Sequence, residues 1–410
     1  MKILFLCNKS PWPAKEGGPM AMSMLIDGLL RAGHHVKVLA VNSYKYNIDV
    51  TKIPAGYLAS TGLELIDLDL RIKIFPAFLN LFTGDSYHIQ RFISGEFSRK
   101  LICCLQSDTY DIVQLETLFM APYIPEIRKY SGAKIILRAH NIEHLIWARI
   151  ADENKNPLKR FYLRHLATTL KKYENGILPQ VDGIAAITPT DAGYFLEVLR
   201  KMEPAAGKRQ PAIPVIDIPF GVDPTQYPYS PEKAEFPSLF TIGAMNWMPN
   251  QEGIRWFLMN VWPDVNKQFP SLKFYLAGRE MPDWMKHLHL PNVVIVGEVE
   301  NAIAFIQSKS IMLVPLFSGS GIRIKIIEAM AAGKTVISTR LGAEGIRCTD
   351  HQDILIASIP CEFFEMISVC ISDQQACNRI GFNARKLIQE EYDCKRIIEK
   401  LIVFYQQSRC

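Results

Sequence analysis

Residues 318–333, with the sequence SGSGIRIKIIEAMAAG, carry the pattern with the clearest chemical meaning. Two glycines before an apolar, alanine-rich run are typical of a strand that ends and a helix that begins, where free backbone N–H groups point toward a bound ligand. Arg323 and Lys325 fall in the expected first turn, and positive charge there opposes the helix dipole unless an anion is bound. A diphosphate would satisfy this arrangement, and Glu328, roughly 10 Å further along the helix, would reach a ribose beyond the phosphates. The alternative is an ordinary strand–turn–helix with a solvated basic turn.

His140 is the second candidate, because it directly follows a strand expected over residues 134–138. In open α/β sheets ligands bind at the carboxyl edge of the strands, so we expect His140 at such an edge. The alternative is a hydrogen-bonded structural histidine. Residues 140–144, HNIEH, also match the His-x-x-Glu-His zinc motif. That motif needs both histidines on one helical face and a third ligand, whereas His140 is expected at the end of a strand, so we expect no metal.

A third candidate is the loop over residues 12–19, WPAKEGGP, which follows the first strand. Gly17 and Gly18 allow backbone N–H groups to come close to a phosphate or an acceptor sugar. The segment is not GxGxxG, so it gives little support to a dinucleotide site. The alternative is a plain surface turn.

The elements that must position these residues follow a βαβ rhythm. A strand over residues 2–7, a Pro/Gly loop over 11–19, a helix over 20–32 and a strand over 35–41 form a unit that requires a parallel sheet. The same alternation of apolar runs and turn residues predicts further elements. The strands are 111–115, 134–138, 183–187, 214–218, 239–242, 273–277, 293–296, 311–315 and 335–339, and the helices are 251–260 and 322–332. We therefore predict an α/β protein made of two doubly wound Rossmann-like domains that face each other across a cleft.

The length of 410 residues suits two domains of roughly 150–200 residues each. A Pro-rich stretch over residues 219–237 is the expected junction. We predict an N-terminal domain over 1–219 and a C-terminal domain over 220–390. Residues 375–407 are charged and helix-forming, and we expect the terminal helix, 391–410, to return to the N-terminal domain.

Composition limits the class of protein. The 46 Lys and Arg against 41 Asp and Glu give a formal charge of +5, too mild to indicate nucleic-acid binding but suited to anionic substrates. Nine cysteines without a CxxC pair favour a reducing compartment over a disulfide framework. The N-terminal apolar run is too short for a secretory signal, and no run reaches about 18 apolar residues. We expect a cytoplasmic protein.

The segment 318–333, with TVIST at 335–339 and GAEG at 342–345 behind it, resembles the donor-binding signature of family 4 glycosyltransferases of the GT-B fold. Four other segments agree with that family, and with them the resemblance covers nearly the whole chain: the Gly17-Gly18 loop, RAHN at 138–141, PFGVD at 219–223 and FTIG at 240–243.

The resemblance implies retaining transfer of a sugar from a nucleotide-diphosphate donor, without a metal or another cofactor. It places His140 close to the anomeric carbon and makes His140, Arg323, Lys325 and Glu328 the catalytic candidates. Further donor contacts are implied at Gly243, Asn246, Gly278, Val299, Gly319, Ser320, Gly321 and Ile322.

Two departures from the family pattern matter. The usual signature has two glutamates with seven residues between them, and the first of these positions is Ser320 here. Residues 243–247, GAMNW, also lack the Arg and Lys that many members use to neutralise the diphosphate. We expect Arg323 and Lys325 to supply that charge instead.

Two stretches indicate the acceptor. Residues 72–82 are apolar and interrupted by Pro76. Basic residues share a probable helix with Phe161, Leu163 and Leu166; they are Lys155, Lys159, Arg160, Arg164, Lys171 and Lys172. A basic amphipathic face beside an apolar loop suits a lipid-linked acceptor and peripheral contact with the anionic inner face of the cell membrane. The alternative is a solvated helix face and a loop that belongs to the core.

The expected function is hexosyl transfer to a hydroxyl of a saccharide or lipid-linked saccharide in cell-surface polysaccharide synthesis. Two alternatives stay open. One is a nucleotide-sugar 2-epimerase of the same fold. The other, suggested by Ser320, is a catalytically silent sugar-nucleotide-binding partner of another transferase.

Overall fold

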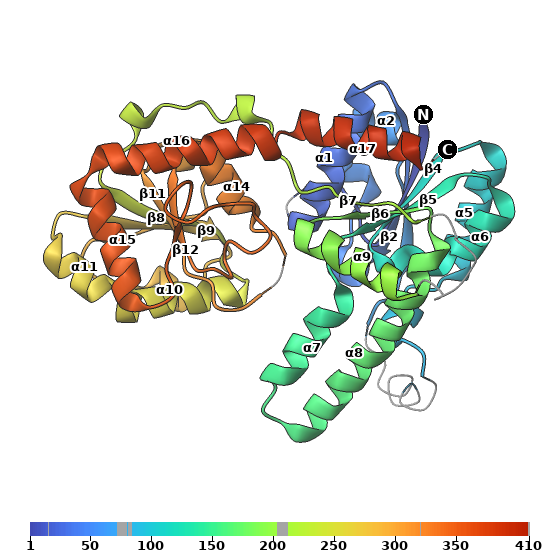
Figure 1. Ribbon diagram of the computed structural model, residues 1–410, viewed down its shortest axis with the longest axis horizontal. Helices are drawn as coiled ribbons and strands as arrows, with labels where there is room; N and C mark the ends of the chain where they lie inside the picture. Colours follow the sequence, from blue (N-terminus) through green and yellow to red (C-terminus); the bar gives the residue numbers. More distant parts are fainter. Residues whose placement is uncertain (15, 72–79, 81–83, 203–211, 320, 409–410) are drawn as a thin grey trace. The chain divides into compact units, whose positions relative to one another are not determined.

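The computed structural model describes residues 1–14, 16–71, 80, 84–202, 212–319 and 321–408 (Figure 1). The chain divides into two compact units. Unit 1 comprises Met1–Pro219 and Ile398–Cys410, and unit 2 comprises Phe220–Ile397.

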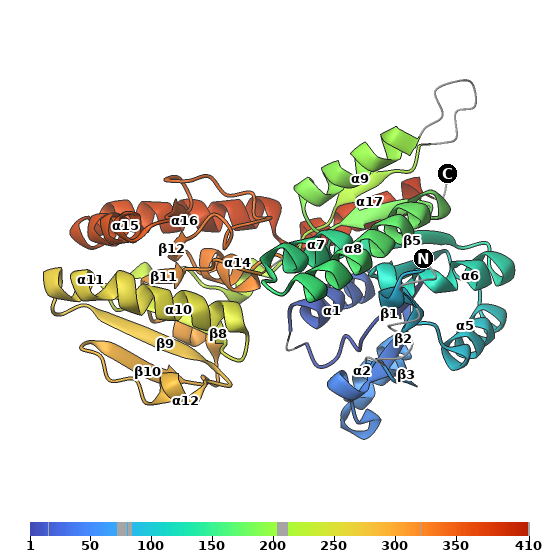
Figure 2. The same cartoon turned by 90° about the horizontal axis from the view of Figure 1, so that it is seen from below.

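Unit 1 is built on a seven-stranded parallel sheet with the order β3-β2-β1-β4-β5-β6-β7. Its strands are β1 (Lys2–Cys7), β2 (His35–Ser43), β3 (Glu64–Leu68), β4 (Ile112–Glu116), β5 (Lys134–Ala139), β6 (Gly183–Ala186) and β7 (Val215–Asp217). The order changes direction between β1 and β4, and β1, β2 and β3 follow one another to one edge (Figure 2). A doubly wound sheet binds ligands at the carboxyl ends of strands beside such a switch point.

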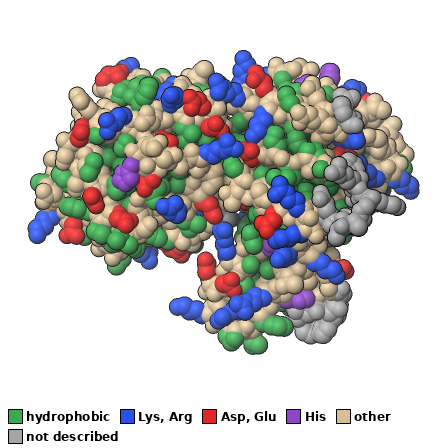
Figure 3. Space-filling model, in the orientation of Figure 1, with side chains coloured by type: hydrophobic (Ala, Val, Ile, Leu, Met, Phe, Trp, Pro, Cys, Tyr) green, Lys and Arg blue, Asp and Glu red, His purple; other side chains and the backbone are tan. Residues whose placement is uncertain are grey.

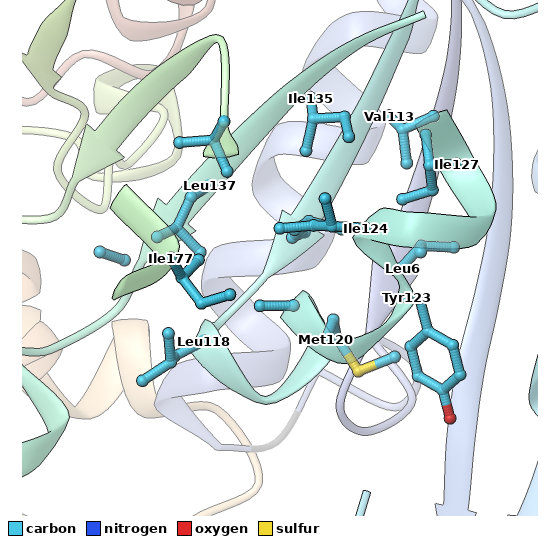
Figure 4. Close-up of a cluster of buried hydrophobic side chains, with 14 of the residues drawn as sticks. Leu6, Val113, Leu118, Met120, Tyr123, Ile124, Ile127, Ile135, Leu137 and Ile177 are labelled. Atoms are coloured by element: carbon cyan, nitrogen blue, oxygen red, sulfur yellow. The ribbon is translucent and has the colours of Figure 1, made fainter. Parts of the chain in front are cut away.

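Helices cover both faces of this sheet. They are α1 (Gly17–Arg31), α2 (Ala55–Thr61), α4 (Tyr87–Gln90), α5 (Gly95–Ser107), α6 (Ile124–Tyr130), α7 (Glu143–Glu153), α8 (Pro157–Ile177), α9 (Pro189–Met202) and α17 (Cys394–Gln407). On one face, Leu6, Val113 and Leu137 of the central strands pack with Ile124 and other apolar side chains of the following segments (Figure 4).

The opposite face of the unit 1 sheet packs against α17. A Cβ atom added to Gly28 of α1 would lie 2.3 Å from Cγ1 of Ile398, and one added to Gly183 of β6 would lie 2.8 Å from Cζ of Phe404. Glycine is therefore needed at both positions for the last helix to lie this close to α1 and the sheet.

Unit 2 has a six-stranded parallel sheet with the order β10-β9-β8-β11-β12-β13. Its strands are β8 (Ser238–Ala244), β9 (Lys273–Arg279), β10 (Val293–Gly297), β11 (Ile311–Val314), β12 (Thr335–Ser338) and β13 (Leu355–Ile356). Its helices are α10 (Met248–Asn260), α11 (Trp262–Gln268), α12 (Asp283–Lys286), α13 (Ala302–Gln307), α14 (Ile324–Ala331), α15 (Pro360–Ser372) and α16 (Gln374–Glu391). An aromatic group centred on Phe257 of α10 joins α10, α15 and the sheet, with ring centroids 5.1 Å from Phe274 and 6.1 Å from Phe363.

The predicted pair of doubly wound parallel sheets is confirmed, and the differences lie in particular elements. Strand β3 was not predicted, because Glu64 and Asp67 interrupt its apolar pattern at the half-buried edge of the sheet. The stretch 375–407 is two helices, α16 and α17, separated around Asp393. Helix α14 begins at Ile324, two residues later than predicted.

Candidate functional site

The candidate residues fall in two groups. Unit 1 carries Gly17, Gly18 and His140, and unit 2 carries the other candidates. Ser320 lies outside the described residues.

The loop between β11 and α14 depends on its glycines. Gly319 has φ 106° and Gly321 has φ 83°, a left-handed backbone conformation that other residues rarely adopt. A Cβ atom on Gly319 would also lie 2.7 Å from Cζ2 of Trp247. The glycines therefore let the chain turn sharply beside the indole ring and enter α14.

Arg323 is the N-cap residue of α14. The prediction that it lies in the first turn of the helix is therefore wrong by one position. Its side chain is buried, with 6% exposure. The guanidinium lies 5.4 Å from the Trp247 ring centroid and donates a hydrogen bond to the Gly321 carbonyl oxygen. Burial lowers the pKa of Arg323, and the charge of Glu344 partly offsets this effect. Arg323 is thus held within the loop, which does not fit a solvated basic turn.

Lys325 lies in the first turn of α14 and is half-buried. Its Nζ donates a hydrogen bond of 2.8 Å to Oδ1 of Asn250, whose amide nitrogen in turn donates to the Ala244 carbonyl at 2.9 Å. Burial and, to a smaller extent, the positive charge of Arg323 lower the pKa of Lys325 to about 7. An anion bound here would raise the pKa of Lys325 again, because a nearby negative charge favours the charged ammonium.

The end of β8 lies beside this ammonium. A Cβ atom on Gly243 would lie 3.6 Å from Nζ of Lys325. Gly243 and Gly278 are register partners of β8 and β9, and a Cβ atom on Gly278 would lie only 2.0 Å from the Gly243 carbonyl oxygen. The structure thus brings Gly243, Gly278 and Lys325 together at the carboxyl edge of the sheet.

The other described donor candidates lie in the segments next to the carboxyl edge of this sheet, some nearer to Lys325 than others. Asn246 follows β8 and donates its side-chain amide to the carboxylate of Glu280, which follows β9. Ile322 is half-buried in the loop before α14. Val299 follows β10, which lies beyond β9 from β8, so it is further from Lys325 along the sheet.

Glu328 lies about one turn into α14, roughly 6 Å along it and not the roughly 10 Å expected, because the helix begins later than predicted. Its Oε1 accepts a hydrogen bond of 3.1 Å from the hydroxyl of the buried Tyr227. Burial raises the pKa of Glu328, and the hydrogen bond from Tyr227 works in the opposite direction. Tyr227 could not be predicted as a site residue from the sequence, because it falls in the Pro-rich stretch 219–237 expected to be a domain junction.

In unit 1, His140 directly follows β5 at the carboxyl edge of the sheet, where it was predicted. Its Nε2 lies 2.6 Å from Oε2 of Glu116, the last residue of β4. The second histidine of the HNIEH motif, His144, lies in the first turn of α7 and places its Nδ1 2.5 Å from Oε2 of Glu174. The two histidines therefore bind different carboxylates, an arrangement that differs from the zinc motif.

The prediction that Gly17 and Gly18 lie in a loop is wrong. They are the first two residues of α1. Their small size has a local reason, since a Cβ atom on Gly18 would lie 3.0 Å from Cε of Lys9. The Lys9 ammonium lies 3.2 Å from Oε2 of Glu16 and 4.7 Å from the ring centroid of Tyr46. This helix start therefore packs around a lysine.

Comparisons with known proteins agree with this architecture. Residues 236–373 match the model of the family described as glycosyl transferases group 1. A protein of Klebsiella pneumoniae described as an uncharacterized 44.6 kDa protein in the cps region is 22% identical over 414 residues, covering 98% of each chain. Sucrose-phosphate synthase from Thermosynechococcus elongatus is similar in structure, with a TM-score of 0.69 and 16% identity over 99% of both chains. HepE of Anabaena, solved with UDP, has a TM-score of 0.65 and 15% identity over 99% of this chain and 100% of its own.

The family match spans the part of unit 2 that contains β8, the glycine loop and α14. The structural likeness extends over both units and establishes the fold. Residues 236–373 therefore match the group 1 glycosyltransferase family, and the chain has the GT-B fold.

Proposed function

We propose that this protein transfers a hexosyl group, with retention, from a nucleotide-diphosphate sugar to a hydroxyl of a saccharide or lipid-linked saccharide. The observation that carries the proposal is the pair of cations at the N-terminus of α14, the buried Arg323 and the half-buried Lys325. The K. pneumoniae relative from the cps, or capsular polysaccharide, region supports a role in cell-surface polysaccharide synthesis.

The charge at this place suits a diphosphate. Burial disfavours a cation, and the positive end of α14 disfavours it again. Both costs are reduced when an anion accepts hydrogen bonds from the cations and from the backbone N–H groups of Gly319 and Gly321. We infer that these groups stabilise the charge of the leaving diphosphate, without a divalent metal ion.

Glu328 is proposed to bind the ribose hydroxyls of the donor. It lies three residues after Lys325, so both side chains share one face of α14. The Tyr227 hydroxyl holds one carboxylate oxygen and leaves the other able to accept from a ribose hydroxyl.

His140 is proposed to lie beside the transferred sugar, as the family resemblance implies. The leaving phosphate would take the acceptor proton on the same face of the sugar, so this chemistry requires no separate general base.

The membrane part of the proposal rests on the α7–α8 hairpin. Figure 1 shows these two helices extending away from the sheet of unit 1, and Figure 3 shows hydrophobic and basic side chains together near their end. Leu158 is 81% exposed and Phe161 is 70% exposed. Five basic and two acidic side chains lie between residues 149 and 164. Exposed apolar side chains within a basic surface suit an anionic lipid headgroup layer.

Two residues expected on this surface lie elsewhere. Leu163 and Leu166 are buried in a cluster with Tyr87 and Ala151, so they support the hairpin and do not face lipid. The apolar stretch 72–82 lies outside the described residues except for Asn80. In the part of the chain that the structure describes, no helix is long and apolar enough to cross a membrane.

The function is tested by incubating the protein with UDP-, GDP- and ADP-sugars, with and without saccharide acceptors, and analysing the products. We expect transfer or slow hydrolysis of one donor with the anomeric configuration retained. Isomerisation of the donor would favour the 2-epimerase instead. Tight binding without turnover would favour a catalytically silent partner.

The donor site is tested by replacing Arg323 and Lys325 together with Ala. Affinity for the nucleoside diphosphate should fall by about 2–4 kcal/mol, because a hydrogen bond to a charged group contributes about 1.5–3 kcal/mol and the two contacts overlap. Affinity for the nucleoside, measured by the same calorimetric titration, should hardly change. A matched control is Lys267→Ala with Lys273→Ala, which removes two exposed cations from α11 and from the amino end of β9. Equal diphosphate affinity in both double variants would place the phosphate site elsewhere.

The hairpin is tested by flotation with vesicles of neutral lipid, with and without about one third phosphatidylserine. Replacing Leu158 and Phe161 with Ser should weaken binding to the anionic vesicles at least about tenfold, since burial of each side chain is worth about 1.5–3 kcal/mol. Met259→Ser, at a position 70% exposed on α10, is the control for loss of an exposed apolar side chain and should bind as wild type. If the wild-type protein does not float with either type of vesicle, the proposal is contradicted.

A further inference from the structure

A line of buried polar side chains runs from His140 to the last helix, α17. Oε2 of Glu116 lies 2.6 Å from Nε2 of His140, and the side-chain amide of Gln114 donates to Oε1 of the same carboxylate. The hydroxyl of Tyr405 in α17 donates to the amide oxygen of Gln114. Gln114, Glu116 and Tyr405 are fully buried, and all of these residues belong to unit 1.

A buried carboxylate needs compensation, because burial favours its neutral form. Burial raises the pKa of Glu116, but the hydrogen bond with His140 and the charges of His140 and Arg138 bring it below the ordinary value. Arg138 is the register partner of Glu116 on β5, and its Nε lies 3.7 Å from Oε2. Glu116 is therefore ionised at neutral pH and acts only as a hydrogen-bond acceptor.

Stability of the fold does not by itself explain the ion pair between Glu116 and Arg138. Arg138 is fully buried, and within the described residues none of its three guanidinium nitrogens has a hydrogen-bond partner. Its role is that of a counter-ion to Glu116. Buried ion pairs of this kind are often no more stable than apolar side chains of the same size. This pair lies at the edge of the sheet with its carboxylate 2.6 Å from His140, so the carboxylate is placed to serve the imidazole.

An ionised Glu116 determines which nitrogen of the neutral imidazole carries the proton. The carboxylate can only accept, so the proton must be on Nε2. Nδ1 then has a lone pair, and in the described part of the chain no protein group is recorded as its partner. His140 is 12% exposed, so part of the ring reaches the surface at the carboxyl edge of β5.

We propose that Glu116 is a positioning residue that fixes His140 as the Nε2–H tautomer, so that Nδ1 accepts a hydrogen bond from a sugar hydroxyl. In this arrangement Tyr405 fixes Gln114, Gln114 fixes Glu116, and Glu116 fixes the ring. The last helix of the chain thereby contributes to the geometry of a residue more than 250 positions earlier. The catalytic consequence rests on the proposed function of His140, whereas the tautomer does not.

The first test measures the tautomer directly by long-range proton–nitrogen NMR on wild-type protein labelled at histidine. The His140 signals are assigned by their loss in His140→Gln, and the spectrum is recorded at about pH 9, well above the ordinary histidine pKa of about 6.5. We expect a proton on Nε2 and none on Nδ1. A ring protonated on Nδ1, in either charge state, would overturn the proposal. Because no substrate is present, failure of this test is separate from failure of the transferase proposal.

The second test compares three variants in the transfer assay. Glu116→Gln, which keeps the shape but loses the negative charge, should lower kcat about 10- to 100-fold and leave the KM for the donor within about twofold, as is typical when the partner that orients a functional group is lost. Tyr405→Phe should lower kcat by a smaller factor in the same manner. Tyr123→Phe, the control, removes another buried hydroxyl of unit 1, one that bonds the Phe92 carbonyl, and should leave kcat unchanged.

A purely structural role predicts a different result. In that case Tyr405→Phe and Tyr123→Phe would lower the melting temperature alike and leave kcat and the His140 tautomer as in wild type. This outcome, or a Glu116→Gln variant with unchanged kcat, would overturn the positioning role.

Discussion

The proposed donor site depends on one constraint: its positive charges lie where burial and the helix dipole disfavour them. Arg323 is buried at the start of α14, and the ammonium of Lys325 lies in the first turn of the same helix. Burial and the charge of Arg323 lower the pKa of Lys325 to about 7, and the helix dipole also disfavours positive charge at this end of α14. A bound diphosphate would offset these penalties, so we expect the unfavourable free state to add to the affinity of the proposed site for a diphosphate.

The surrounding structure keeps these cations in place without neutralising them fully. Trp247 lies against the guanidinium, and Asn250 offers Lys325 a neutral acceptor. Gly243 and Gly278 bring the ends of β8 and β9 close together because neither carries a side chain there. In unit 1, His140 is held by an ionised carboxylate, Glu116, which the counter-ion Arg138 and the Gln114 amide keep charged.

Local patterns in the sequence predicted the fold and the positions of several candidate site residues at the ends of strands. Buried parallel strands form apolar runs that end in glycine or polar residues, so β5 and its edge residue His140 could be located from the sequence. The side-chain partners of these residues could not be predicted from the sequence. Glu116 meets His140 through the register of β4 and β5, and Tyr227 meets Glu328 across 101 residues, and neither spacing follows a local period. A usable signal was present in the polar residues at alternate positions of β4, Gln114 and Glu116, within an otherwise apolar strand.

The central claim is tested most directly by the protons taken up when a nucleoside diphosphate binds. With a pKa of about 7, Lys325 is mostly neutral at pH 8 in the free protein, and a bound diphosphate should raise that pKa and recharge it. Titration of UDP by calorimetry at pH 8, in two buffers with different ionisation enthalpies, should therefore show uptake that approaches one proton per UDP. Lys325→Met should show almost none. Binding without proton uptake in the wild type, or equal uptake in both proteins, would contradict the account.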